Sequence, residues 1–248
     1  MHITILENER RFDTEAAQRI IRQIEEKPTS VVGLSTGRTT KGIHQALKET
    51  CLARRIDTSR ATFVCIDEVA GVYETYSGAC VTMVRNEFAD ALGIDRQRLL
   101  CLPTRSDDYR QACQRFTSEI KRRGGIDLLI LGLGENGHVG FNQPGSPFGG
   151  TARLAEMDSQ LEQRIRRETA TPPSQPLGGA TLGIRDIMHS RRIVLVAKGR
   201  RKAAIVRQML LGPVVESLPA SVLQLHPCCE FVFDTEAASE LPESETTT

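Results

Sequence analysis

The sequence predicts an α/β protein with one domain, built on a doubly wound, mostly parallel sheet with helices on both faces. The first observation is a set of short, unbroken apolar runs, of which residues 128–131 are the clearest, with the length and composition of strands buried on both faces. The second is that amphipathic segments with helical spacing separate these runs. Strands that alternate with helices are typical of parallel sheets, and 248 residues suffice for such a core.

The predicted elements of the N-terminal half follow from these patterns. Residues 3–6 predict a strand, and the apolar stripe of residues 14–27 predicts a helix that Pro28 ends. Two further strands are predicted at residues 31–34 and 62–66, and further helices after residue 40, at 79–92 and at 107–121, with a brief apolar segment at 99–102.

The C-terminal half repeats the alternation around one interruption. Residues 126–144 supply the central strand and a glycine-rich turn, and residues 193–197 supply another strand before a helix that residues 199–202 open. Residues 145–178 between them are polar and rich in arginine and proline, which indicates a mobile flap over a site rather than a linker. The predicted domain spans residues 1–234, and residues 235–248 form an acidic, disordered tail.

Composition excludes several classes of function. The net charge is +1 with no basic block, which argues against a nucleic-acid partner. The sequence shows neither a signal-peptide pattern nor an apolar run long enough to span a membrane, which favours a cytoplasmic protein. Its 7 scattered cysteines suit reduced thiols and include no C-x-x-C pair, so no metal is assigned.

The glycine-rich turn is the first candidate site. Four glycines at positions 132, 134, 137 and 140 surround His138 directly after the central strand. Glycine lets a backbone approach a ligand closely, and ligands of open α/β sheets bind beyond the carboxyl ends of the strands. The alternative is a tight turn with an incidental surface histidine, but four glycines around one titratable side chain favour a site.

A second candidate is the Ser-Thr-Gly-Arg-Thr-Thr turn at residues 35–40, between a predicted strand and a predicted helix. Such a layout directs backbone N–H groups and the helix dipole towards an anion. The spacing matches neither a nucleotide P-loop nor a dinucleotide site, so a small phosphate fits better than a nucleotide. Ordinary helix capping explains the same residue types, and this turn alone leaves both explanations open.

Asp67 and Glu68 form the third candidate, at the end of the strand predicted for residues 62–66. A carboxylate enclosed on the ligand side of the sheet can act as a base with a shifted pKa. The alternative is a capping or solvated acidic pair. Together the three candidates predict a small-anion site made by several loops, without specifying a reaction.

Five motifs, in order, resemble the glucosamine-6-phosphate deaminase/isomerase family, whose superfamily includes 6-phosphogluconolactonases. They are the turn at 35–40, Ile-Asp-Glu at 66–68, Gly132 to Pro144, Thr-Leu-Gly-Ile at 181–184 with the turn at 199–202, and Leu-Gln-Leu-His-Pro at 223–227. The Phe and Asn that follow His138 favour the deaminase branch. The resemblance implies a modified Rossmann-like sheet and, without a cofactor, isomerisation of a 2-amino-2-deoxyhexose 6-phosphate with release of ammonia.

The resemblance also implies residue roles. Asp67 would take the C2 proton to form an enediol-type intermediate, and His138 would assist ring opening, as a carboxylate and an imidazole can. The catalytic set is Asp67, His138, Asn136 and Gln143. The substrate- and phosphate-binding set is Ser35, Thr36, Gly37, Arg38, Thr39, Thr40, Glu68, Gly137, Arg167 and Lys202.

The sequence departs from the family pattern beside the histidine. Members of the family carry an aspartate two residues before it and a glutamate five residues after it, where this sequence has Asn136 and Gln143. An amide oxygen still accepts the imidazole N–H, but the imidazolium loses its counter-charge. A charged hydrogen bond contributes about 1.5–3 kcal/mol, which corresponds to about ten- to a hundred-fold in rate. Arg38 also adds a positive charge where the family usually has a small residue.

These departures leave three hypotheses. The first is a deaminase/isomerase acting on glucosamine 6-phosphate or a variant such as galactosamine 6-phosphate. The second is a 6-phosphogluconolactonase-like hydrolase in which His138 activates water. The third is a non-catalytic sugar-phosphate sensor. In each case the expected partner is a small sugar phosphate, and homo-oligomer formation, which is common in the family, is possible.

Overall fold

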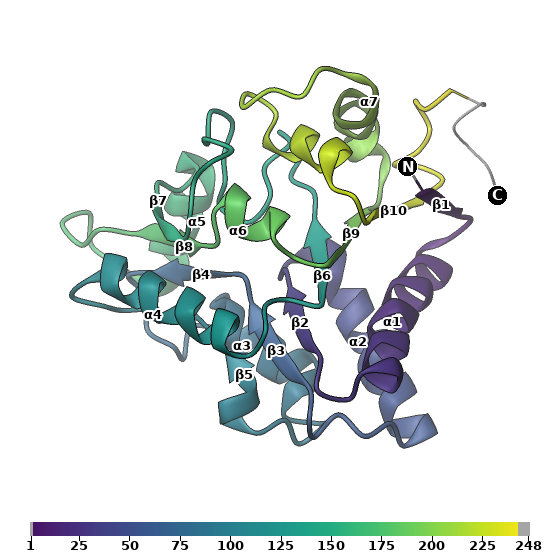
Figure 1. Cartoon of the computed structure of the whole chain (residues 1–248). Coiled ribbons are helices and arrows are strands. Elements are labelled where there is room, and N and C mark those ends of the chain that lie inside the picture. The colour runs from purple at the N-terminus through teal and green to yellow at the C-terminus, as the bar shows by residue number, and fades with distance from the viewer. Residues whose placement is uncertain (1, 243–248) are drawn as a thin grey trace.

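A parallel sheet of seven strands forms the centre of the computed structural model, which describes residues 2–242 (Figure 1). In spatial order the strands are β1 (His2–Leu6), β10 (Cys229–Asp234), β9 (Arg192–Ala197), β6 (Leu128–Gly132), β2 (Val31–Leu34), β3 (Thr62–Cys65) and β5 (Leu99–Leu100). Strand β6 is the middle one, between β9 and β2. The stretch predicted to be central therefore is central, and the glycine-rich turn leaves the carboxyl end of the middle strand.

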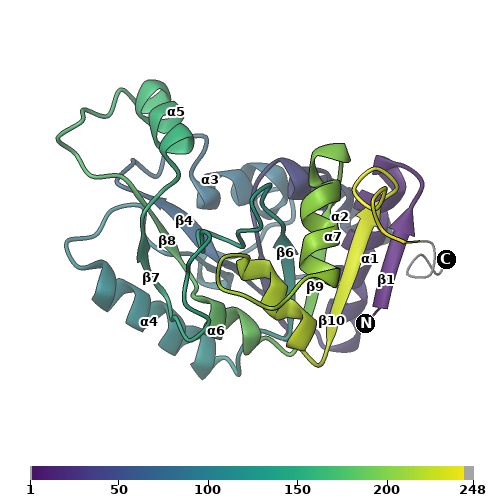
Figure 2. The same ribbon diagram turned by 90° about the horizontal axis from the view of Figure 1, so that it is seen from above.

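Helices cover both faces of this sheet (Figure 2). One face packs against α1 (Glu9–Glu26), α2 (Arg38–Arg54), α3 (Cys80–Val84) and the π-helical turn η1 (Arg85–Ala89). The other face packs against α4 (Tyr109–Arg122), α6 (Ile184–Met188), α7 (Ala203–Leu211) and the 3₁₀ turn η4 (Pro219–Leu225). Alternate residues of β6, such as Leu128 and Leu129, enter the two cores in turn. The predicted doubly wound α/β fold is confirmed.

A second, antiparallel sheet was not predicted. It consists of β4 (Asp67–Ala70), β8 (Gly178–Thr181) and β7 (Arg153–Ala155), in the order β4-β8-β7. Asp67 and Glu68, predicted to lie at the end of the preceding strand, therefore begin a separate strand. Four-residue strands, one of them Gly-Gly-Ala-Thr, carry too little apolar alternation to be recognised in the sequence.

Several helix boundaries differ from the prediction. Helix α1 begins at Glu9, five residues early, because the Asn8 side chain caps it by accepting from the N–H of Arg11. The helix predicted at 79–92 is only five residues of α-helix followed by the π turn η1. Helix α4 begins two residues later than predicted and buries Cys113 and Phe116 along one face.

The predicted flap contains regular structure. Residues 145–178 include β7 and α5 (Ser159–Thr169), and Met157 and Ile165 pack with Val69 and Phe141 in a small third core. The residues that follow Asp234 are ordered for longer than predicted, since Ala237 and Ala238 are buried in the main core. Of the tail predicted at 235–248, residues 243–248 lie outside the described residues. Within residues 2–242, none of the helices has the length and apolar character needed to cross a membrane.

Candidate active site

His138 lies in the turn that follows β6, and the turn is held at several points. Gly134 N–H donates to the His138 carbonyl at 2.9 Å, and Lys202 Nζ donates to the Leu133 carbonyl at 2.7 Å. Gly134 has no room for a side chain, because a Cβ there would overlap the imidazole ring. Gly137 and Gly140 adopt positive φ angles of 82° and 56°. The predicted need for glycine is therefore steric at Gly134 and conformational at Gly137 and Gly140, whereas Gly132 has neither requirement.

An amide relay orients the imidazole. Asn136 Oδ1 accepts both the backbone N–H of His138 at 3.2 Å and its Nδ1–H at 2.6 Å. Asn136 Nδ2 donates in turn to Gln143 Oε1 at 2.9 Å. Because the amide oxygen accepts twice, ring nitrogen Nδ1 carries a proton, and the neutral imidazole presents Nε2 as an acceptor. Both residues predicted to replace the family carboxylates thus support the histidine.

The surroundings of His138 favour its neutral form. Burial lowers the pKa of His138, and the positive charge of Lys202 lowers it further. Asp158, which caps the start of α5, opposes this effect. Within residues 2–242 no carboxylate is hydrogen-bonded to the ring, so the site holds an imidazole that accepts a proton only weakly.

Asp67 is the carboxylate of the site whose pKa suits a general base. Its side chain is buried, and burial raises its pKa to about 7, with a further contribution from the neighbouring Glu68. The Cys80 thiol opposes the shift by donating to Asp67 Oδ1 at 3.7 Å. A Cβ built on Gly140 would lie 3.4 Å from Asp67 Oδ2, so the histidine turn passes directly against this carboxylate.

Glu68, predicted as a substrate ligand, caps the start of a helix in this structure. The side chain is fully buried, and its two oxygens accept the backbone N–H groups of Val69, Cys80 and Val81 at 2.7–2.9 Å. Cys80 and Val81 open α3, so Glu68 satisfies the free N–H groups at the start of that helix. The capping alternative therefore describes Glu68, and the role of Asp67 as a base stays a prediction.

The turn at residues 35–40 lies beside both groups. Ser35 Oγ accepts from the N–H of Gly132 at 3.2 Å. Thr36 lies close enough to Cys80 to lower the pKa of its thiol, and that thiol contacts Asp67. Gly37, with φ of 136°, precedes α2, so Arg38, Thr39 and Thr40 form the first helical turn with their backbone N–H groups at the helix start. Among the described residues no side chain caps the N–H groups at the start of α2, which leaves them available to an anion.

Lys202 approaches the same place from the turn after β9. It ends the 3₁₀ turn η3 (Arg200–Lys202), and burial lowers its pKa to about 8. Glu135 opposes this shift, while Arg38 and Arg201 add to it. Since Lys202 also affects the pKa of His138, the cation and the imidazole lie within electrostatic reach of each other.

Arg167 stays a predicted phosphate ligand, without a contact to the other site residues among residues 2–242. It lies exposed in the last turn of α5 and forms no hydrogen bond or ion pair within residues 2–242. The flap reaches the site through the other end of α5, at Asp158, and through Phe141, which packs in the third core with Met157 and Ile165.

Two residues of the site had no role in the prediction. Thr181 accepts the Phe141 N–H at 3.2 Å through Oγ1 and stands opposite Asp67 in the pairing of β4 with β8. Cys80 contacts Asp67 across the core. Thr181 belongs to one of the motifs that carried the family resemblance, so a signal for it existed, whereas a lone cysteine in a helix gave none.

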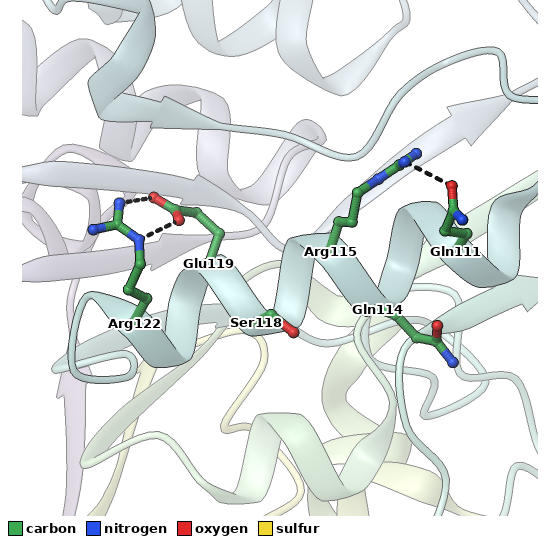
Figure 3. A pocket seen from close by; sticks show the side chains of 6 residues that line it. All are labelled: Gln111, Gln114, Arg115, Ser118, Glu119 and Arg122. Atoms are coloured by element: carbon green, nitrogen blue, oxygen red, sulfur yellow. Dashed lines mark hydrogen bonds and ion pairs between the residues drawn. The ribbon is translucent and has the colours of Figure 1, made fainter.

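Two surface hollows lie away from these residues. One, of about 310 Å³, runs along the exposed face of α4, where Arg122 pairs with Glu119 and Arg115 with Gln111 (Figure 3). The other, of about 240 Å³, lies between residues 74–85 and 96–104. None of the predicted site residues lines either hollow. The part of the chain that the structure describes contains no group of three His, Cys, Asp or Glu side chains placed to hold a metal ion.

Known proteins are similar to this chain along nearly its whole length. The family model described as "Glucosamine-6-phosphate isomerases/6-phosphogluconolactonase" matches residues 7–230. A glucosamine-6-phosphate deaminase of Halothermothrix orenii is 34% identical over 97% of this chain and 100% of its own. One of Rhodopirellula baltica is also 34% identical, over 97% of this chain and 96% of its own.

Solved structures agree with the sequence relatives. A monomeric glucosamine-6-phosphate deaminase superposes with a TM-score of 0.90 at 30% identity, covering 97% of this chain and 100% of that one. A 6-phosphogluconolactonase from Trypanosoma cruzi, at 17% identity and a TM-score of 0.78 over 97% of this chain and 96% of its own, shares the fold. The chain belongs to the glucosamine-6-phosphate isomerase/6-phosphogluconolactonase family.

Proposed function

We propose that the protein is a deaminase/isomerase that converts a 2-amino-2-deoxyhexose 6-phosphate and water to a ketohexose 6-phosphate and ammonia. The observation that supports this most directly is a buried carboxylate with a pKa of about 7, Asp67, against a turn that carries an oriented imidazole, His138. Aldose–ketose isomerisation needs one group to move a proton between adjacent carbons and another to handle the ring-oxygen proton.

The proposed steps assign one task to each group. The 6-phosphate binds to the N–H groups that open α2 and to Lys202, through charge-assisted hydrogen bonds. His138 is neutral, with Nε2 as an acceptor. It takes the proton of the C1 hydroxyl and passes it to the ring oxygen as the pyranose opens. Asp67 removes the C2 proton and returns a proton to C1, and water replaces the amino group, which leaves as ammonia.

Glucosamine 6-phosphate is the first substrate to test, because the relatives at 34% identity are named as its deaminases. The altered partners of His138 motivate galactosamine 6-phosphate as the second. The enzyme acts in amino-sugar metabolism as a hydrolase on a C–N bond, in the cytoplasm. Homo-oligomer formation is a separate proposal, which sedimentation equilibrium tests; one solved relative is described as monomeric.

The test is release of ammonia and ketose phosphate from a panel of hexosamine 6-phosphates, with Asp67→Asn and His138→Ala as controls. We expect turnover of at least one epimer and its loss in Asp67→Asn. Turnover of none of them, with binding retained, would favour a sugar-phosphate sensor. Hydrolysis of 6-phosphogluconolactone that Asp67→Asn leaves intact would favour the lactonase reaction.

A further inference from the structure

Two cationic side chains converge on one carboxylate at the edge of the proposed phosphate site. Glu135 stands in the histidine turn, Arg38 opens α2, and Arg201 lies in η3 beside Lys202. Arg38 Nη2 lies 3.8 Å and Arg201 Nε 3.7 Å from the same oxygen, Glu135 Oε1. Loops after three separate strands, β2, β6 and β9, thus contribute to one charged cluster, which we call the rim: Arg38, Glu135 and Arg201.

The rim contacts are loose. Both distances exceed that of a hydrogen bond, and the side chains of Arg38, Arg201 and Glu135 are 84%, 73% and 46% exposed. Solvent screens such pairs strongly, so each contributes little to folding. A structural role therefore explains the rim poorly, because the fold gains little from holding two arginines at one carboxylate.

The charge balance of the rim favours an anion from outside. Two arginines and Lys202 carry three positive charges against the one negative charge of Glu135, which leaves +2 beside the start of α2. A phosphate monoester carries a charge of about −1.5 to −2 at neutral pH and three acceptor oxygens. A guanidinium group binds such oxygens through two parallel N–H bonds, a geometry that neither arginine makes with Glu135 here.

We propose that Arg38 and Arg201 are further phosphate ligands and that Glu135 is a built-in competitor, which occupies both guanidinium groups until a phosphate dianion displaces it. This rests on the proposed function, since it takes the start of α2 and Lys202 as the phosphate site. Glu135 weakens phosphate binding by attracting the two arginines. When the site is empty, Glu135 lowers the charge of the three cations from +3 to +2.

The competition predicts that removing Glu135 and removing either arginine change the affinity for phosphate in opposite directions. Removing the competitor with Glu135→Gln strengthens binding of inorganic phosphate, and removing a ligand with Arg38→Gln or Arg201→Gln weakens it. From the size of exposed ion pairs, we expect changes of about two- to five-fold in each direction. The changes shrink between about 0.01 M and 0.15 M salt, because the screening length falls from about 30 Å to about 8 Å.

Arg200→Gln is the matched control. Arg200 belongs to the same turn, is equally exposed and carries the same charge, but among the described residues it forms no ion pair with Glu135 and is no cause of the Lys202 pKa shift. Calorimetric titration of the full chain with inorganic phosphate gives the Kd of each variant. Phosphate binding that Glu135→Gln leaves unchanged or weakens overturns the proposal, as does an Arg200→Gln effect equal to that of Arg201→Gln.

Phosphate binding and turnover separate the two proposals. A wild type that binds phosphate with the expected pattern of variants but turns over no hexosamine 6-phosphate contradicts the proposed reaction and leaves the rim supported. Turnover by the wild type together with equal phosphate affinity in all four variants contradicts the rim and leaves the reaction supported.

Discussion

Replacing Asp67 by asparagine should abolish turnover and, at alkaline pH, make the protein more stable. The pKa of Asp67 is about 7 in the folded protein against an ordinary 3.8, because burial and Glu68 disfavour the charged form. A pKa raised on folding means that the folded state holds the proton more tightly, so stability falls as pH rises from about 4 to about 7. Above pH 7 the whole cost of burying the charge is present.

The size of the effect follows from the pKa difference. About three pKa units at 1.36 kcal/mol each give a cost of about 4 kcal/mol at pH 8. Relaxation around a buried charge reduces such values, so we expect Asp67→Asn to gain about 2–4 kcal/mol at pH 8 and less than about 1 kcal/mol at pH 4. Asparagine keeps the shape of the side chain and removes only the ionisation.

Urea unfolding from pH 4 to pH 8, followed by circular dichroism, measures both values. Asp127→Asn is a control with the opposite sign, because the Asp127 carboxylate is buried but paired with Lys27 and Arg191, each at 2.8 Å. We expect that variant to lose about 1–3 kcal/mol at pH 8. If Asp67→Asn is no more stable than wild type at pH 8, the carboxylate is not held at a cost, and the physical case for a base at this position fails.

Three other perturbations test the remaining parts of the site. Asn136→Asp should raise the pKa of His138 by about one unit, through a charged partner at the 2.6 Å position, and NMR titration of the ring would detect a failure to shift. Gly140→Ala should lower kcat/KM about ten-fold or more, because its Cβ would lie 2.7 Å from Thr181 Oγ1 and 3.4 Å from Asp67. Gly145 also has a positive φ, of 89°, but open space around it, so Gly145→Ala should lower only the stability. Equal kinetics in the two variants would contradict the importance of the contact at Gly140. Binding of inorganic phosphate should weaken as pH rises through about 8, where Lys202 loses its charge, and Lys202→Met should remove that step; an unchanged step would assign the titration to another group.

The sequence predicted the large sheet well because its strands are buried on both faces. Strands β2, β6 and β9 consist mainly of continuous apolar runs, which have the length and composition of strands buried on both faces. The second sheet escaped prediction because β4 begins with two carboxylates and β8 with two glycines. Pairing with each other, rather than residue preference, makes these segments strands.

The π turn at residues 85–89 shows a different limit. Residues 79–92 contain the apolar spacing of a helix, and both kinds of turn place Val84 and Phe88 on the same face. His44 of α2 lies against Phe88, with ring centroids 5.4 Å apart, and its Nδ1 contacts Glu87 at 2.6 Å. Partners of this kind come from distant segments, so a single segment cannot predict the wider turn.

The histidine turn was located by composition, but its chemistry depends on directions that composition does not give. Replacing two carboxylates by amides makes His138 a weaker base only where the amide contacts the imidazole. Asn136 contacts the ring, whereas Gln143 contacts Asn136. A single charge restored at Asn136 would therefore act on the ring directly, and one restored at Gln143 would act through an amide. Restoring both would bring two carboxylates to a contact that is now 2.9 Å, so their repulsion would hold a proton on one of them and the gains in His138 basicity would not add.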